Sequence, residues 1–167
     1  MQGKKSIAFA TILTLAAVGE IVLTVVLYRE PGNTLVRNLG WVVMWTAGIF
    51  GGLPVLMFKR WGGVPRGKSY VHTTRLVDRG LYAIVRHPQY LAGLLIGLGL
   101  AMIAQHWLVA LLGLVVAAVS YVDTFEEEKA VLEKLGPAYE AYRASVPRMN
   151  FVLGIVRWLR RVLGGRS

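Results

Sequence analysis

A basic pair stands at the start of an apolar stretch in the second half of the chain. Arg86 and His87 precede Pro88, and the residues from 89 to 104 are almost all apolar. Proline is favoured at the first position of a helix because its missing N–H would be unpaired there anyway, so His87 is expected at the N-cap. A helix N-terminus presents free N–H groups and a positive dipole end. The pair therefore predicts either an anion site or an interfacial contact with lipid phosphates.

One face of that expected helix carries an aromatic ring followed by glycines. Tyr90, Gly93 and Gly97 recur at helical spacing, and Gly99 follows them. Because glycine has no side chain, Gly93 and Gly97 are expected to leave a groove beneath the Tyr90 ring. Gly93 and Gly97 also form a GxxxG pattern, which brings membrane helices close together. The pattern fits a binding groove, packing within the chain, or a homodimer.

Four carboxylates cluster at the end of a later apolar stretch. Asp123 and Glu127 are four residues apart, and Glu126 and Glu128 lie beside them. Like charges at this helical spacing repel one another, more strongly where solvation is poor. Either basic neighbours on a solvated helix end or a bound sulfonium or ammonium ligand would offset the repulsion.

A single carboxylic acid, Glu20, interrupts the first apolar stretch near its middle. Ionisable groups at that depth are costly, and they are usually functional or paired inside a helix bundle. Glu20 is therefore expected to line a cavity or a helix interface, or to be a buried, hydrogen-bonded carboxyl.

Composition places these residues in a membrane protein. Of the 167 residues, 55% are hydrophobic and 17% are charged, which is more apolar than an ordinary soluble domain. We predict an all-α polytopic membrane protein, a single domain over residues 1–167 with about four transmembrane helices and a C-terminal cytoplasmic helical segment. The expected spans cover residues 6–28, 39–58, 89–104 and 107–122.

The basic residues predict the orientation of the chain. With four spans, only Arg29 and Arg37 of the 19 lysines and arginines fall on the far side. The positive-inside rule then places both termini and the 59–87 loop in the cytoplasm. Because the net charge of +10 is explained in this way, no nucleic-acid partner is expected. The basic C-terminal tail is expected to lie along the membrane surface.

Metal and cysteine chemistry are not expected. The chain has no cysteine, which excludes disulfides, thiolate metal sites and a cysteine nucleophile. The three histidines, at positions 72, 87 and 106, are scattered and form no zinc motif.

Two motifs on either side of the expected helical hairpin resemble those of the isoprenylcysteine carboxyl methyltransferases. The first is Arg86-His87-Pro88-x-Tyr90-x-x-Gly93. The second starts at Glu127-Glu128 and continues through Leu132, Leu135-Gly136, Tyr139, Tyr142 and Val146-Pro147-Arg148. Phospholipid N-methyltransferases share the Arg-His-Pro, Gly-x-Gly and Glu-Glu elements. The resemblance covers residues 76–148.

The resemblance implies S-adenosylmethionine as cofactor, S-adenosylhomocysteine as product, and a lipid or prenylated acceptor that enters from the bilayer. The implied cytoplasmic cofactor-site elements are residues 76–93 and 123–148. The residues that it assigns to the cofactor are Arg86, His87, Tyr90, Gly93, Gly97, Gly99 and Glu127. It assigns catalysis to Glu128 and Arg148 and acceptor binding to Tyr139 and Tyr142. Glu20 joins the acceptor residues because of its depth in the membrane.

The chain departs from the pattern in two places. Many relatives carry an arginine just before the acidic pair, where this chain has Asp123, Thr124 and Phe125. Many also continue the Val-Pro-Arg motif with a second proline, where this chain has Met149 and Asn150. The cation that would orient a substrate carboxylate is therefore Arg148, Arg143 or Arg86.

The expected activity is carboxyl O-methylation of the isoprenylcysteine type at the cytoplasmic membrane face. A carboxylate acceptor needs no base and would be held by Arg148, whereas an amine acceptor must lose a proton, for which Glu128 is the expected base. Phospholipid amine N-methylation is therefore an alternative. A nicotinamide-dependent membrane reductase, which can share a similar hairpin and arginine-histidine motif, and a non-enzymatic membrane scaffold are two further alternatives.

Overall fold

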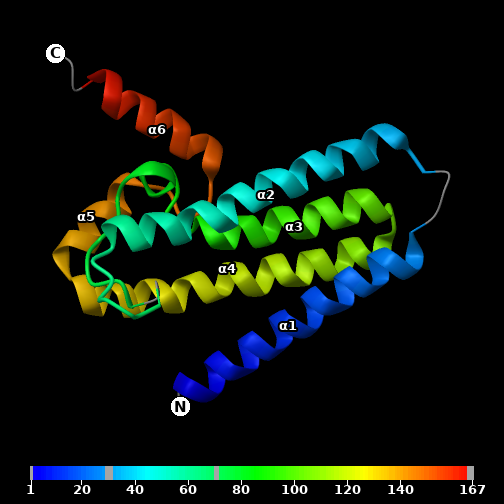
Figure 1. Cartoon of the computed structure of the whole chain (residues 1–167), viewed down its shortest axis with the longest axis horizontal. Coiled ribbons are helices and arrows are strands. Elements are labelled where there is room, and N and C mark those ends of the chain that lie inside the picture. The colour runs from blue at the N-terminus through cyan, green and yellow to red at the C-terminus, as the bar shows by residue number, and fades with distance from the viewer. Residues whose placement is uncertain (1, 29–31, 70–71, 165–167) are drawn as a thin grey trace. The chain divides into compact units, whose positions relative to one another are not determined.

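The computed structural model describes residues 2–28, 32–69 and 72–164, and in these ranges the chain forms α-helices and no strand (Figure 1). The helices are α1 (Gln2–Leu27), α2 (Thr34–Trp61), α3 (Pro88–Ala104), α4 (Trp107–Leu135), α5 (Pro137–Ser145) and α6 (Phe151–Gly164). A short 3₁₀ helix, η2 (Gly80–Ala83), precedes α3. The all-α prediction is confirmed.

Three of the described helices are long and apolar enough to cross a membrane. They are α2, α4 and the Ala10–Leu27 segment of α1. The fourth apolar helix, α3, has 17 residues and reaches about 26 Å, slightly less than a ~30 Å hydrocarbon core. The polytopic membrane class is therefore confirmed, with α3 as the shortest apolar helix. The predicted boundary at residue 122 is not a helix end, because α4 continues through the acidic stretch to Leu135.

The chain divides into two compact units. One comprises residues 1–49 and 90–125, and the other comprises residues 50–89 and 126–167. We call them the first unit and the second unit and describe each by itself.

Glycines bring the helices of the first unit close together. A Cβ at Gly40 of α2 would lie 3.0 Å from the carbonyl oxygen of Gly99 in α3. A Cβ at Gly97 would lie 3.2 Å from the Cα of Gly113 in α4. Many large apolar side chains on these helices are exposed, as expected of a surface that faces lipid. Close packing at small residues thus holds these helices together, whereas a soluble bundle relies on a core of large apolar side chains.

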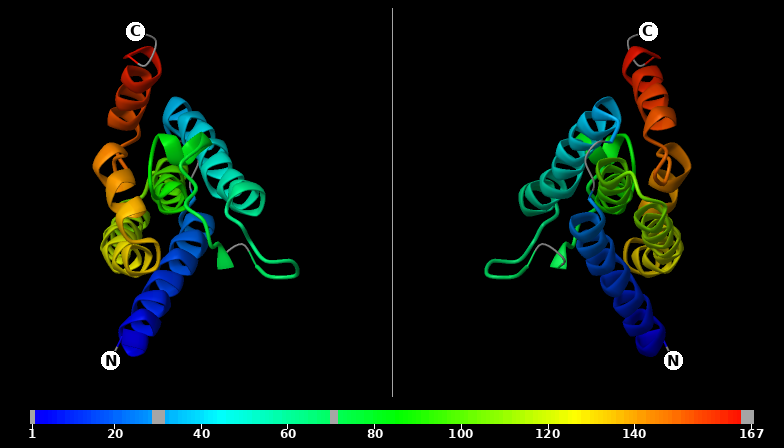
Figure 2. Two further views of the ribbon diagram at one scale, coloured as in Figure 1. Left: turned by 90° about the vertical axis from the view of Figure 1, so that its left-hand side faces the viewer. Right: turned by 90° about the vertical axis from the view of Figure 1, so that its right-hand side faces the viewer.

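The second unit contains the loops and the short C-terminal helices. Residues 62–69 leave the end of α2 as an irregular loop (Figure 2). The backbone carbonyl of Gly62 accepts hydrogen bonds from the amides of Thr74 and Arg75, at 2.8 and 3.0 Å. This carbonyl ties the returning chain to the end of α2.

A small core in the second unit holds α5 against the end of α4. The buried side chains are those of Tyr139, Tyr142 and Val146, with Leu76, Val131, Leu132 and Leu135 packed around them. Gly136 has a φ of 56°, a left-handed conformation that glycine adopts readily, and Pro137 is the first residue of α5. Gly136-Pro137 thus separates α4 from α5.

Helix α6 is capped by Asn150 and fixed by a close backbone contact. The Asn150 side-chain oxygen accepts a hydrogen bond from the Leu153 amide at 2.9 Å, which is N-cap geometry. A Cβ at Gly154 would collide with the carbonyl oxygen of Ile84. Only glycine at position 154 allows α6 to approach this backbone.

Gly154→Ala should therefore destabilise the protein, because the added methyl group meets backbone that cannot yield cheaply; overpacking costs about 1–3 kcal/mol. Thermal unfolding in detergent micelles would measure the effect. Gly164→Ala in the same helix is the matched control, since a Cβ there meets nothing within 4 Å and alanine is the better helix former. Equal unfolding midpoints for the two variants would contradict the close contact at Gly154.

Candidate active site

Backbone pairing in the second unit brings the two sequence motifs together. The amide of Arg86 donates a hydrogen bond to the Pro147 carbonyl at 3.0 Å, and the amide of His87 donates one to the Arg148 carbonyl at 3.1 Å. The residues that open α3 therefore lie beside the segment between α5 and α6. Side chains from Arg86-His87 and from Arg148 can then reach the same partner.

That shared partner is the buried carboxylate of Glu128. Arg148 binds it through two hydrogen bonds, from Nε to Oε1 at 3.1 Å and from Nη2 to Oε2 at 2.7 Å. Arg86 Nη2 lies 3.2 Å from Oε1, and His87 Nε2 lies 3.0 Å from the same oxygen. Two-pronged arginine–carboxylate contacts are strong and directional. One acid on α4 thus holds three basic side chains in fixed positions.

His87 is held between both members of the acidic pair. Its Nδ1 lies 3.5 Å from Glu127 Oε2, and its Nε2 faces Glu128. Burial alone would lower the pKa of His87, but the hydrogen bonds and charges of Glu127 and Glu128 outweigh burial and raise the pKa above its ordinary value. An imidazole with a carboxylate at each nitrogen is best satisfied when both nitrogens carry protons. Both carboxylates therefore favour the protonated, positively charged form of His87.

The Arg86 guanidinium has more N–H donors than the described residues satisfy. Among the residues that the structure describes, none accepts a hydrogen bond from its buried Nε and Nη1 atoms. Burial lowers the pKa of Arg86, and the charge of Glu128 opposes this change, yet a guanidinium stays protonated in proteins. Buried charged donors without acceptors are costly. They fit an anionic ligand that completes the site.

Tyr139 and Tyr142 are part of the core of α5. The Tyr142 hydroxyl donates a hydrogen bond to the Tyr82 carbonyl at 2.7 Å. Burial raises the pKa of Tyr139 to about 12 and also raises that of Tyr142, so both phenols are neutral near pH 7. Their predicted role in acceptor binding stays a prediction.

In the first unit, Tyr90 pairs with Asp123. The Tyr90 hydroxyl donates a hydrogen bond to Asp123 Oδ2 at 2.9 Å. Asp123 and Glu127 thus have different partners, the Tyr90 hydroxyl for Asp123 and the His87 ring for Glu127. Sequence reasoning missed this pair, because residues 33 positions apart carry no local signal of contact.

The glycines of α3 differ in their surroundings. A Cβ at Gly93 would meet nothing within 4 Å, which leaves the expected groove open there. Gly97 packs against Gly113, and a Cβ at Gly99 would lie 2.7 Å from the Met44 side chain. The structure thus places Gly97 and Gly99 at helix contacts in the first unit, and their assignment to the cofactor stays a prediction.

Glu20 fills the space beside two of these glycines. Its side chain is fully buried, and Oε1 has no hydrogen-bond partner within the described part of the chain. A Cβ at Gly113 would lie 2.7 Å from Oε1, and a Cβ at Gly97 would lie 3.3 Å from it. The carboxyl therefore occupies volume left by missing side chains. Its predicted place in an acceptor cavity is not tested by this arrangement.

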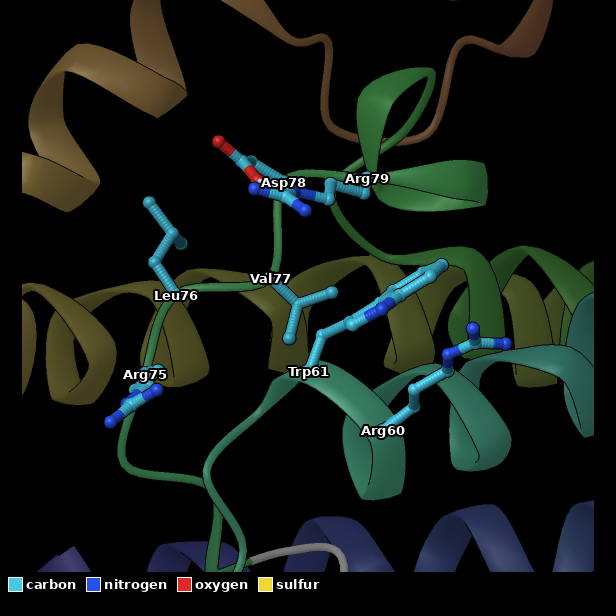
Figure 3. A pocket seen from close by; sticks show the side chains of 7 residues that line it. All are labelled: Arg60, Trp61, Arg75, Leu76, Val77, Asp78 and Arg79. Carbon is cyan, nitrogen blue, oxygen red and sulfur yellow. Dashed lines mark ion pairs between the residues drawn. The ribbon is translucent and has the colours of Figure 1, made fainter.

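A separate pocket in the second unit contains none of the predicted site residues. It measures about 330 Å³ and is lined by Arg60, Trp61, Arg75, Leu76, Val77, Asp78 and Arg79. In Figure 3, Trp61 and Val77 lie at its centre, and Arg60 and Arg75 point to opposite sides. Its basic groups do not converge on one point, unlike those around Glu128.

The helices and the charged cluster define a multi-pass membrane protein with a polar site at a helix entry. A family model described as phospholipid methyltransferase matches residues 43–137. Because the match covers more than half of the chain, the protein belongs to this family. It is therefore a membrane methyltransferase, and the family implies S-adenosylmethionine as its methyl donor. No curated protein and no solved structure matches the chain.

The family match bears directly on the sequence predictions. It contains the Arg86-His87 motif, the glycines of α3 and the acidic pair, and it ends before Tyr139, Tyr142 and Arg148. The predicted family and the predicted enzyme class are confirmed.

The adjacent acids Glu127 and Glu128 should respond very differently to substitution. The Glu128 side chain is 4% exposed and that of Glu127 is 45% exposed. Glu128→Gln leaves the buried Arg86 and the partly buried Arg148 without their carboxylate partner and should cost about 3–5 kcal/mol of unfolding free energy. Glu127→Gln removes one half-exposed contact and should cost less than about 1 kcal/mol. Denaturant unfolding in detergent compares the two variants, and equal losses would refute the buried cluster.

Proposed function

We propose that the chain binds S-adenosylmethionine at the cluster of Arg86, His87 and Glu128 and methylates the carboxylate of an isoprenylcysteine-type acceptor. The observation that carries the proposal is the buried guanidinium of Arg86, whose Nε and Nη1 have no acceptor within the described part of the chain. The methionine part of the cofactor bears a carboxylate, and a carboxylate oxygen is a strong acceptor for a charged guanidinium N–H such as Nε or Nη1. The residues present therefore suit this cofactor.

In this proposal Glu127 and Glu128 have different roles. Glu128 is a positioning residue, because its two oxygens are already bound by Arg86, His87 and Arg148. Glu127 is half-exposed, and the structure gives it one contact with His87 at 3.5 Å. Its carboxylate is thus the better placed of the two to face a cationic group. The bound cofactor would donate the methyl group of its sulfonium, and the rest of the cofactor would leave as a neutral thioether.

Charge favours a carboxylate as the acceptor. The two arginines and the protonated His87 exceed the two acids of the pair, so the cluster suits anions. Among the basic side chains, Arg148 is 18% exposed, whereas Arg86 and His87 are 8% and 6% exposed. Arg148 is therefore the group most accessible to an acceptor. A carboxylate needs no base, whereas an amine would need one other than Glu128, whose oxygens three basic groups already bind.

Phospholipid amine N-methylation is the second candidate, because the matching family is described as phospholipid methyltransferase. A lipid acceptor is common to both candidates.

We also propose that both termini and the 59–87 loop face the cytoplasm, on the basis of the positive-inside rule. Labelling of Lys68→Cys by a membrane-impermeant maleimide in sealed vesicles of known orientation tests this topology.

Arg86→Lys should weaken binding of S-adenosylhomocysteine by about tenfold or more, since the single ammonium of lysine can satisfy either Glu128 or the ligand carboxylate, whereas the guanidinium has separate donors for each. Calorimetric titration of the purified protein in detergent measures this change. Arg79→Lys is the matched control, because Arg79 is exposed and paired only loosely with Asp78 at 3.8 Å. Undiminished affinity in Arg86→Lys, or no binding by the parent protein, would refute the cofactor site.

An acceptor assay with methyl-labelled cofactor separates the two candidate reactions. The label should enter a farnesylated cysteine acceptor as an ester that alkali releases as methanol. Arg148→Lys should lower kcat/KM by about tenfold, the expected loss of one charge-assisted hydrogen bond. Arg143→Lys should change kcat/KM little, because Arg143 is exposed and pairs with the exposed Glu140 at 3.7 Å. Alkali-stable label on phosphatidylethanolamine would instead establish N-methylation.

A further inference from the structure

Helix α6 presents one face to the rest of the second unit. Gly154 and Arg161 are seven residues apart and therefore lie on the same side of the helix. Gly154 packs against the carbonyl of Ile84, and Arg161 Nη2 donates a hydrogen bond to the carbonyl of Ala83 at 2.7 Å. Phe151 adds an edge-on contact with Phe50, with ring centroids 5.1 Å apart. These contacts fix the orientation of α6 about its axis.

A second face of α6 is apolar and exposed. Val152, Val156, Leu159 and Leu163 recur at intervals of four, three and four residues, so they form one stripe. Their exposed fractions are 75%, 41%, 42% and 65%. A continuous apolar stripe of this kind marks an interaction surface.

A third face of α6 is basic. Leu153, Arg157 and Arg160 follow the same intervals, shifted by one residue. The helix contains no acidic residue. An apolar stripe beside a row of arginines is the pattern of helices that lie in the plane of a membrane interface.

The contacts that hold α6 lie close in the chain to the start of an apolar helix. Ala83 and Ile84, which contact α6, lie five and four residues before Pro88, the first residue of α3. At most about 3.5 Å per residue, this separation keeps the anchored end of α6 within about 18 Å of the point where α3 begins. The exposed stripe is therefore attached near the boundary between the polar loop and the apolar helix α3.

We propose that α6 docks on the cytoplasmic membrane surface, with Val152, Val156, Leu159 and Leu163 in the lipid and Arg157 and Arg160 on anionic phosphates. Charge decides between lipid and a second copy of the chain as the occupant. Two α6 stripes packed together would bring their flanking arginines near one another, whereas anionic lipids attract each arginine. The inference is independent of the methyl-transfer reaction.

The absence of cysteine allows single nitroxide labels to test the docking in the full-length protein. The matched pair is Val152→Cys on the apolar stripe and Leu153→Cys on the basic face. In nanodiscs that contain phosphatidylglycerol, the label at 152 should be relaxed more by oxygen than by a water-soluble nickel chelate. The label at 153 should show the reverse. Equal behaviour at both positions would overturn the proposal.

Removal of the arginine charges tests the role of anionic lipid. In Arg157→Gln/Arg160→Gln, the ratio of docked to undocked α6 should fall about fivefold per arginine, in discs with phosphatidylglycerol but not in purely zwitterionic discs. Arg157→Lys/Arg160→Lys should keep the parent ratio. No difference between the two double variants would overturn the charge contribution. Dipolar broadening between labels at 152 in discs with two chains would identify a second copy as the occupant and overturn lipid docking.

Discussion

Two arginines and a histidine share one buried carboxylate, that of Glu128 on α4. Removal of charges from water costs several kcal/mol for each ion, and only close, well-oriented partners offset this cost. The buried charge of Glu128 is compensated only if Arg86, His87 and Arg148 all lie close to it. The start of α3 and the segment after α5 must therefore lie side by side. The backbone hydrogen bonds from Arg86 and His87 to the Pro147-Arg148 segment meet this requirement. Helices α5 and α6 are therefore positioned by the same carboxylate.

This arrangement suits a reaction in which positioning supplies most of the rate enhancement. Methyl transfer from a sulfonium needs an aligned acceptor more than it needs proton transfer, and a fixed site supplies alignment at low entropic cost. A rigid Glu128 keeps the guanidinium groups of Arg86 and Arg148 in place before any ligand binds.

Several properties were predictable because they depend on composition or on a few neighbouring residues. The long apolar stretches specify membrane helices, since only helices and barrels satisfy the backbone in lipid. Pro88 marks the start of α3, and Gly136-Pro137 separates α4 from α5. The membrane class, the helix order and the place of the Arg86-His87 pair at a helix entry therefore follow from local rules. The C-terminal boundary of α4 was harder to predict, because a helix can leave the apolar region without ending.

Other properties were decided only by tertiary packing. Glu127 and Glu128 are chemically identical neighbours, and their spacing does not reveal that Glu128 is buried under three basic groups while Glu127 is half-exposed. Tyr90 and Asp123 likewise meet only because α3 and α4 pack together. The sequence by itself determined which helices form and which motifs they carry, because those depend on interactions within a few residues. The partner of each charge was set by contacts between distant segments, since burial and distance govern electrostatic energy.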